Sequence, residues 1–228
     1  MTGLQPMQAE IRLILVPAGA EHRAVRRGLN GGGPRVVAIP AGPRAVKQFL
    51  DTWADRWLLH SGGVLLVGLG GSLCADYRVG EGVLIEQVWN GAEPERAGVY
   101  GCDRTLTAQI ATQLGLKTAV GVSCDRVITT TVQKRDLCDR YGATVVDMEA
   151  AALLQAHCKI AILRVISDDA HHDLPDLSAA IGADGMLKPL PVALSFLQQP
   201  VAALRLIRGA LTGLKSLETL ISLLFSRD

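Results

Sequence analysis

The sequence has few aromatic residues, no excess of either charge and no closely spaced cysteines. Phenylalanine, tryptophan and tyrosine make up 4% of the 228 residues, and the formal net charge is +1. The chain therefore lacks the excess positive charge that attracts nucleic acids and has few of the aromatic side chains on which bases stack. We expect no nucleic-acid partner. The five cysteines form no CxxC pair, which argues against a structural zinc site or a disulfide framework. We therefore predict a cytoplasmic protein.

Long hydrophobic runs are also missing, and short ones alternate with helical patterns. The run from Ile11 is broken by Pro17 and follows no basic leader, which predicts a first strand rather than a signal peptide. Apolar runs without alternation predict strands that are buried on both faces. The expected strands are 11–16, 35–39, 64–69, 83–88, 119–123, 144–146 and 160–166, and the expected helices are 20–29, 43–60, 103–114, 132–141 and 148–157.

This alternation predicts an α/β fold in a single domain over residues 1–228. Helices between the strands should cover both faces of a mostly parallel or mixed sheet, which gives three αβα layers. Ligands of open α/β sheets bind outside the carboxyl ends of the strands. The functional residues are therefore expected in the segments that follow the strands.

Two acidic residues stand at such positions. Glu149 lies where a strand pattern changes to an alanine- and leucine-rich helix pattern, and Asp168 ends the apolar run that begins at Ile160. We expect both carboxylates to face one crevice. Asp147 should point elsewhere, from the other side of the strand end.

The motifs Met148-Glu149-Ala150 and Ser167-Asp168 resemble the purine nucleoside phosphorylase and methylthioadenosine/S-adenosylhomocysteine nucleosidase superfamily. Segments 64–72 and 78–85 are similar to its glycine turn and to the strand after it. The resemblance implies cleavage of the N-glycosidic bond of a purine nucleoside or adenosyl compound, with adenine as the expected base. It also implies that Asp168 is the general acid to the base, kept protonated by burial, and that Glu149 holds the ribose hydroxyls.

The same resemblance implies binding roles for further residues. Met148 would pack on the sugar, and the glycine turn would lie against the ribose and the nucleophile. Segment 123–128 resembles the part of the family that reads the base, with Val127 at the stacking position. The substrate-binding residues expected on these grounds are Met148, Ser167, Gly70, Gly71, Ser123 and Val127.

Water is favoured over phosphate as the nucleophile. Purine nucleoside phosphorylases of the hexameric type tend to carry an arginine just before the glycine turn, where this chain has Leu66. Glu21 is the only carboxylate in the segment that resembles the nucleosidase loop beside the attacking water, so it is the third candidate catalytic residue. Two alternatives stay open: phosphorolysis, with inorganic phosphate as co-substrate held by other arginines (Arg23, Arg26, Arg27 or Arg44), and a nucleoside-binding module without chemistry.

We expect no cofactor and no metal. If Gly68 and Gly70 began a dinucleotide fingerprint, its third glycine would fall at Leu73. His171 and His172 are adjacent in a loop and do not present one face to a metal, as histidines spaced i, i+4 do.

The last part of the chain, 171–228, is predicted to be a divergent apolar helical tail. Residues 201–225 carry a stripe at helical spacing: Leu204, Ile207, Leu211, Leu214, Leu217, Ile221 and Leu224. The stripe predicts a core or subunit-interface helix, and we expect a homo-oligomer. Segment 183–191 and this tail resemble the hopanoid-associated branch of the superfamily, which implies an adenosyl-lipid substrate and peripheral contact with the inner face of the membrane.

Overall fold

A computed structural model describes residues 10–92, 98–156, 158–175, 196 and 198–226. Segment 183–191, which in part carries the resemblance to the hopanoid-associated branch, lies outside the described residues. His157, the last residue of the helix predicted over 148–157, also lies outside them.

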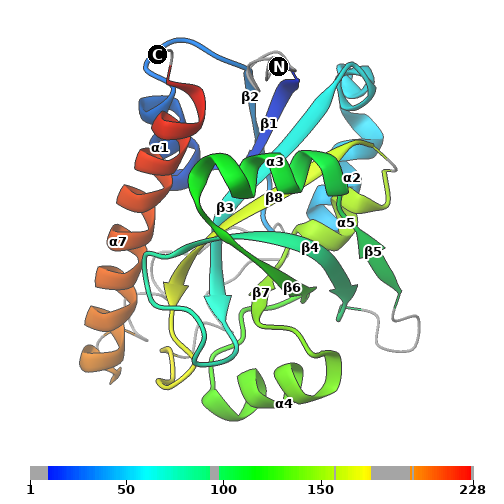
Figure 1. Ribbon diagram of the computed structural model, residues 1–228. Coiled ribbons are helices and arrows are strands. Elements are labelled where there is room, and N and C mark those ends of the chain that lie inside the picture. The colour runs from blue at the N-terminus through cyan, green and yellow to red at the C-terminus, as the bar shows by residue number, and fades with distance from the viewer. Residues whose placement is uncertain (1–9, 93–97, 157, 176–195, 197, 227–228) are drawn as a thin grey trace.

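A mixed sheet of eight strands forms the centre of the protein (Figure 1). The pairs of β1 with β2, β1 with β3, β3 with β8, β4 with β6 and β6 with β7 are parallel, whereas β3 with β7, β4 with β5 and β4 with β8 are antiparallel. The predicted α/β class with a mixed sheet is confirmed. The strands are β1 (Ile11–Pro17), β2 (Arg35–Ile39), β3 (Gly63–Ser72), β4 (Gly82–Asn90), β5 (Val99–Gly101), β6 (Lys117–Ser123), β7 (Val145–Asp147) and β8 (Ile160–Asp168).

Part of the sheet closes on itself. β3 pairs with β8, β8 with β4, β4 with β6, β6 with β7, and β7 returns to the end of β3. At the closing point Gly71 has Val146 of β7 as its partner on one side and Asp168 of β8 on the other. The two strand ends that carry the predicted acids therefore flank one residue of β3.

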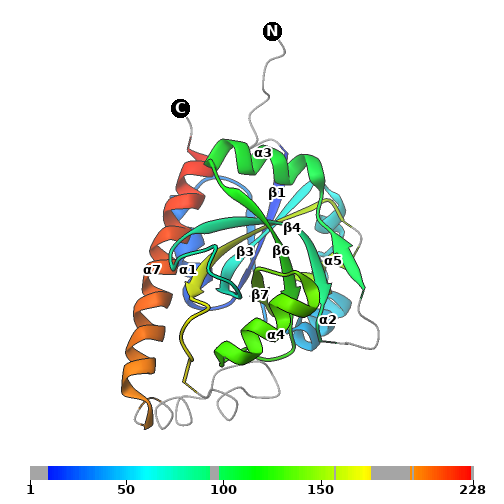
Figure 2. The same ribbon diagram turned by 60° about the horizontal axis from the view of Figure 1, so that its bottom comes forward.

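Helices cover both faces of the sheet, as predicted (Figures 1 and 2). α1, α3 and α7 share one apolar cluster with the sheet, α2 and α5 share another, and α4 packs on the ends of β6 and β7 through a third. The helices are α1 (Ala20–Gly28), α2 (Pro43–Thr52), the 3-10 helix η2 (Arg56–His60), α3 (Arg104–Leu114), α4 (Thr131–Tyr141), α5 (Ala150–Leu154) and α7 (Pro200–Phe225).

Local signals explain where most helices begin and end. Thr130 and Gln133 form a capping box at the start of α4, and Gly142 ends that helix with a left-handed φ of 59°. The single helix predicted over 43–60 is wrong, because Trp53 is extended and separates α2 from η2. β5 was not predicted, since three residues are too few to show a periodicity.

Helix α7 buries only part of the predicted apolar stripe. Leu217 and Ile221, in its second half, are fully buried against α1 and α3. Leu204 and Leu211, in its first half, are 48% and 62% exposed. The second half is therefore a core helix, as expected, and the first half turns its stripe away from the core of this chain. Among the described residues, no helix combines the length and the apolar character needed to cross a bilayer.

In the first half of α7, two glycines take the place of apolar side chains against the sheet. A Cβ on Gly209 would lie 2.1 Å from the backbone oxygen of Ser167, and a Cβ on Gly213 would lie 2.8 Å from Cδ2 of Leu69. The first neighbour is rigid backbone beside Asp168, whereas the second is the end of a flexible side chain. Of these two positions, only Gly209 therefore requires a close approach to backbone.

We expect Gly209→Ala to lower the free energy of unfolding by about 1–3 kcal/mol, since the helix must move away from β8. Gly213→Ala is the matched control. There a small shift of Leu69 is offset by the better helix propensity of alanine, so the change should stay below about 1 kcal/mol. Urea denaturation of both variants measures the difference. Equal free energies of unfolding for the two variants would show that α7 does not pack closely against the backbone of β8 at Gly209.

Candidate active site

A cavity of about 220 Å³ lies at the carboxyl ends of β1, β3, β7 and β8. The segment before α4 and the residues after β8 complete its wall. Eight residues nominated from the sequence line it: Glu21, Gly70, Gly71, Val127, Met148, Glu149, Ser167 and Asp168. The structure thus brings these residues together in a crevice at the strand ends, as expected. Their individual roles stay predictions.

Ser123, the remaining nominated residue, lies behind the cavity wall. Its hydroxyl donates to Oδ1 of Asp147 and accepts from the backbone N–H of Ala151 at 2.9 Å. The side chain is 1% exposed and does not line the cavity. Ser123 therefore holds Asp147 and the first turn of α5, while Arg126, Val127 and Ile128 of the same segment face the cavity.

The glycine-rich segment is part of β3 rather than a turn after it. A Cβ on Gly68 would lie 2.5 Å from Nη1 of Arg164 and 2.8 Å from Oε1 of Glu21. A Cβ on Gly71 would lie 2.9 Å from Oδ2 of Asp168. These glycines therefore leave room for the charged side chains of neighbouring elements, in addition to the close ligand approach that was expected of them.

Arg164 lies at the centre of the acidic cluster, and the sequence analysis did not identify it. Its guanidinium is fully buried, with Nη2 paired to Oδ2 of Asp147 and 3.2 Å from Oε2 of Glu149. Burial by itself would lower the pKa of Arg164, but the carboxylates of Asp147 and Glu149 raise it above its ordinary value. A charged residue inside the apolar run of β8 was the signal that could have revealed this ion cluster.

Asp147 lines the cavity, so the expectation that it points elsewhere is wrong. The alternation of side chains along β7 did not predict its direction, because the strand ends at this residue. The contact with Arg164 and the hydroxyl of Ser123 determine its position instead.

Glu21 reaches the cavity from the first turn of α1. Its Oε1 accepts a hydrogen bond of 2.7 Å from the backbone N–H of Leu69. Burial raises the pKa of Glu21 from 4.5 to about 7; the charge of Glu149 adds to this rise, and the Leu69 N–H and Arg164 oppose it. A carboxyl group that titrates near neutral pH is suited to take a proton from water.

Glu149 immediately precedes α5 and is 5% exposed. Its Oε1 accepts from the backbone N–H of Gly42 at 3.2 Å, and Gly42 has a φ of +89° that only glycine adopts readily. Burial raises the pKa of Glu149 and Asp147 adds to the rise, whereas Arg164 and the N–H of Gly42 favour the ionised form. The carboxylate makes no capping bond to its own helix, and it lines the cavity.

Asp168 is held on both of its carboxylate oxygens. The hydroxyl of Ser167 donates to Oδ1 at 3.0 Å, and Nζ of Lys134 lies 2.6 Å from Oδ2. Asp168 therefore has a cation as its direct neighbour, whereas the expectation was of burial without a charged partner. Lys134 was missed because a lysine in a polar helix predicts a solvated position.

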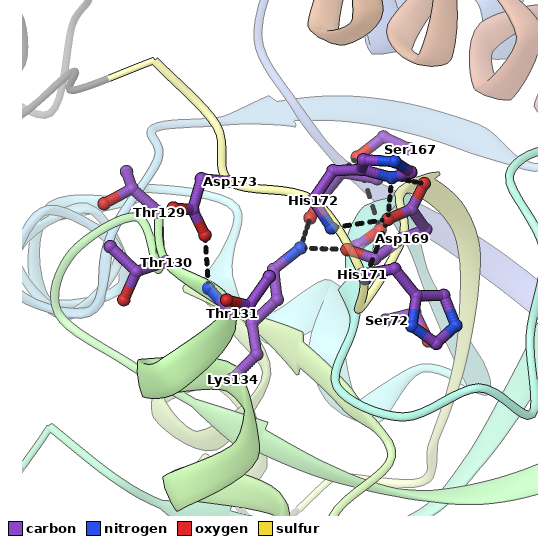
Figure 3. Close-up of polar contacts among 12 residues, drawn as sticks. Ser72, Thr129, Thr130, Thr131, Lys134, Ser167, Asp169, His171, His172 and Asp173 are labelled. Atoms are coloured by element: carbon purple, nitrogen blue, oxygen red, sulfur yellow. Dashed lines mark hydrogen bonds and ion pairs between the residues drawn. The ribbon is translucent and has the colours of Figure 1, made fainter. Parts of the chain in front are cut away.

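The histidines after β8 interact with Asp169 instead of converging on a common point. Nδ1 of His172 lies 2.9 Å from Oδ1 of Asp169, and Figure 3 shows the His172 and Asp169 side chains side by side. Over the described parts of the chain, no group of three or more histidine, cysteine, aspartate or glutamate side chains could hold a metal ion.

The positions considered for phosphate lie outside the cavity. Leu66 is fully buried in the core. Arg27 forms an ion pair with Glu218 of α7. Although all four are among the described residues, none of Arg23, Arg26, Arg27 and Arg44 lines the cavity.

Comparison with known proteins agrees with this fold. The family model described as "Phosphorylase superfamily" matches residues 17–184. Futalosine hydrolase from Thermus thermophilus is 28% identical over 166 residues, which cover 63% of this chain and 73% of that protein.

Two solved structures from Helicobacter pylori share the fold. The complex of 5′-methylthioadenosine/S-adenosylhomocysteine nucleosidase with butyl-thio-DADMe-Immucillin-A aligns with a TM-score of 0.62 at 19% identity, over 93% of this chain and 97% of that one. Native futalosine hydrolase aligns with a TM-score of 0.62 at 18% identity, again over 93% and 97%. Since the family match covers most of the chain and the resemblance seen in the sequence points the same way, the protein belongs to the phosphorylase superfamily.

Proposed function

We propose that the protein is a nucleosidase that hydrolyses the N-glycosidic bond of a purine nucleoside or adenosyl compound, with water as the nucleophile. The observation that carries this proposal is the position of Glu21. Its carboxyl group, with a pKa of about 7, lines the same cavity as Asp168. A base for water and an acid for the leaving group are both required for hydrolysis.

The cavity offers a role to each charged side chain. Glu21 takes a proton from water. Arg164 helps to hold the carboxylates of Asp147 and Glu149 in place through Nη2. Its Nε and Nη1 have no partner among the described residues. Glu149 accepts hydrogen bonds from the ribose hydroxyls, with Met148 beside the sugar. Asp168 passes a proton to the departing base. The acidic cluster also stabilises the positive charge that the ribose develops in the transition state.

Relatives support the substrate class at a coarse level. The Thermus thermophilus relative is a futalosine hydrolase, and the Helicobacter pylori nucleosidase binds an immucillin. Val127 offers the base an aliphatic contact in place of an aromatic ring. We propose adenine as the released base, as the sequence motifs imply.

One observation favours an apolar substituent on the ribose, such as that of an adenosyl-lipid. The exposed apolar face at the start of α7, with Val201 and Leu204, borders a hollow of about 340 Å³. A narrower hollow that contains Asp168 and Arg205 lies between that face and the segment after β8. Contact of this face with a membrane, and assembly into a homo-oligomer, stay predictions.

The test is to detect free purine after incubation with different nucleosides, each with and without inorganic phosphate. The set should include methylthioadenosine, S-adenosylhomocysteine, inosine, adenosine, futalosine and an adenosyl-lipid. We expect one of them to release its base at the same rate in both conditions, because none of the arginines considered for phosphate (Arg23, Arg26, Arg27 and Arg44) lines the cavity. Release that requires phosphate would indicate a phosphorylase, and no release from any compound would indicate a binding module.

A further inference from the structure

Helix α4 directs a fully buried lysine at the general acid. The side chain of Lys134 is 0% exposed, and its Nζ donates both to Oδ2 of Asp168 and to the backbone oxygen of Asp169. Figure 3 shows this side chain reaching from α4 to the segment that contains Ser167 and Asp169. Burial of an ammonium group is unfavourable unless close partners compensate for the lost water. The carboxylate and the carbonyl are those partners.

The distance between α4 and the end of β8 is fixed by two hydrogen bonds that backbone N–H groups donate. The N–H of Thr131 donates to Oδ1 of Asp173 at 2.7 Å, and the N–H of Leu174 donates to the backbone oxygen of Thr129, also at 2.7 Å. Both bonds tie the start of the helix to the segment after β8. These bonds keep Lys134 on α4 and Asp168 at the end of β8 within hydrogen-bond distance of each other.

We propose that Lys134 is a positioning residue that supplies the proton which Asp168 passes to the leaving base. The proposal rests on the proposed hydrolysis and concerns the origin of its proton. In the ion pair of Nζ with Oδ2 of Asp168, the carboxylate by itself has no proton to give. The pair as a whole holds one, on Nζ of Lys134.

The protons released and taken up in the reaction balance among these groups. The C–N bond breaks and its electron pair leaves with the base. The proton moves from Nζ to the Asp168 carboxylate and from there to a ring nitrogen of the base, which leaves Lys134 as a neutral amine. Water adds to the sugar carbon and gives its proton to Glu21. Transfer of that proton through solvent to Lys134 restores both groups.

Several of the other charged groups around the pair have partners of their own. Those that face it are Asp169, His172 and Asp173 after β8, Asp147 and Glu149 from β7 and the start of α5, Glu21 from α1, Arg126 before α4, and Arg205 from α7. Asp169 pairs with His172, and Asp147 and Glu149 pair with Arg164. Within the described residues, Lys134 is the cation in direct contact with Asp168.

The test compares the pH dependence of kcat/KM for base release in the wild type and Lys134→Met. In the wild type the pair keeps its proton until the lysine loses it, so the rate stays level into alkaline solution. In the variant the proton is lost when Asp168 ionises, and the rate should fall tenfold per pH unit above that point. We expect a deficit of at least about 100-fold at pH 8 and of less than about 10-fold at pH 5. A deficit that is the same at every pH would overturn the proposal.

Two further variants separate proton supply from charge. Lys134→Arg keeps the cation but holds its proton too tightly to give it up, so it should lose activity at pH 8 as Lys134→Met does. Full rescue by arginine would overturn the proposal. Arg135→Met removes the same charge from the exposed neighbouring position on α4 and should match the wild type at every pH.

A measurement without turnover keeps this proposal distinct from the proposed function. If the wild type releases no base from any nucleoside, the proposed function fails, and a carbon-13 NMR titration of the Asp168 carboxyl decides about the lysine. We expect that carboxyl to take up its proton at a pH at least one unit higher in Lys134→Met than in the wild type, because the ammonium no longer stabilises the charge. Identical titration curves would show that the pair does not control the proton, which would refute the proposal.

Discussion

Asp168→Asn is expected to lower kcat for base release by about 10²–10⁴-fold, which is the usual effect of removing a positioned general acid. The amide is close in size to the carboxylate and can still accept from the hydroxyl of Ser167, but it cannot carry the proton to the base. The purine-release assay at saturating substrate measures this loss. KM should change less than kcat, since protonation of the base develops in the transition state.

Asp139→Asn is the matched control, because Asp139 is an exposed acid on α4 with no role in the cavity. It should keep the activity of the wild type. Circular dichroism should show the same secondary structure for both variants. If Asp168→Asn retained normal turnover, Asp168 could not be the general acid, and the acid would have to be sought among the other cavity carboxylates.

Glu21→Gln is expected to slow hydrolysis strongly and, at the same time, to stabilise the protein above neutral pH. A base works only when ionised, so kcat/KM of the wild type should fall tenfold per pH unit below the pKa of about 7. The amide cannot take a proton from water, and the loss of activity should again be about 10²–10⁴-fold. The pH profile of the wild type and the residual rate of the variant measure these effects.

The gain in stability follows from the direction of the pKa shift. The pKa of Glu21 is raised by burial from 4.5 to about 7 in the folded protein. Between these two values the folded state binds more protons than the unfolded state, so stability is lost as the pH rises through this window. Above pH 7 the ionised side chain is unfavourable by about 1–3 kcal/mol, allowing for its partial exposure.

Glutamine avoids this cost and can still accept the hydrogen bond from the N–H of Leu69. The variant should therefore unfold at a higher urea concentration than the wild type at pH 8 and at an equal one at pH 4. Lower stability at pH 8 would show that the ionised Glu21 is stabilised in the fold, and the assignment of a base with a neutral pKa would have to be abandoned.

The sequence by itself determined the features that depend on local pattern. Continuous apolar runs predicted the long strands, because residues that are buried on both faces of a sheet must be apolar along the whole strand. Capping residues and glycines marked the ends of helices such as α4. Glu149 and Asp168 could be found because each follows an apolar run, and the carboxyl ends of such strands meet at one edge of a sheet.

Only the tertiary structure decided which charges meet and how they are compensated. The local sequence does not predict where the side chains of Arg164, Asp147 and Lys134 point. Their directions depend on ion-pair partners from other elements. The closed pairing around β3 brings the ends of β7 and β8 together at Gly71. Tertiary packing also explains why only the second half of the apolar stripe of α7 is buried. In the first half, Gly209 lies against the end of β8, where any larger side chain would clash with the backbone of Ser167. Long-range contacts of this kind follow from packing, and packing is a property of the whole chain.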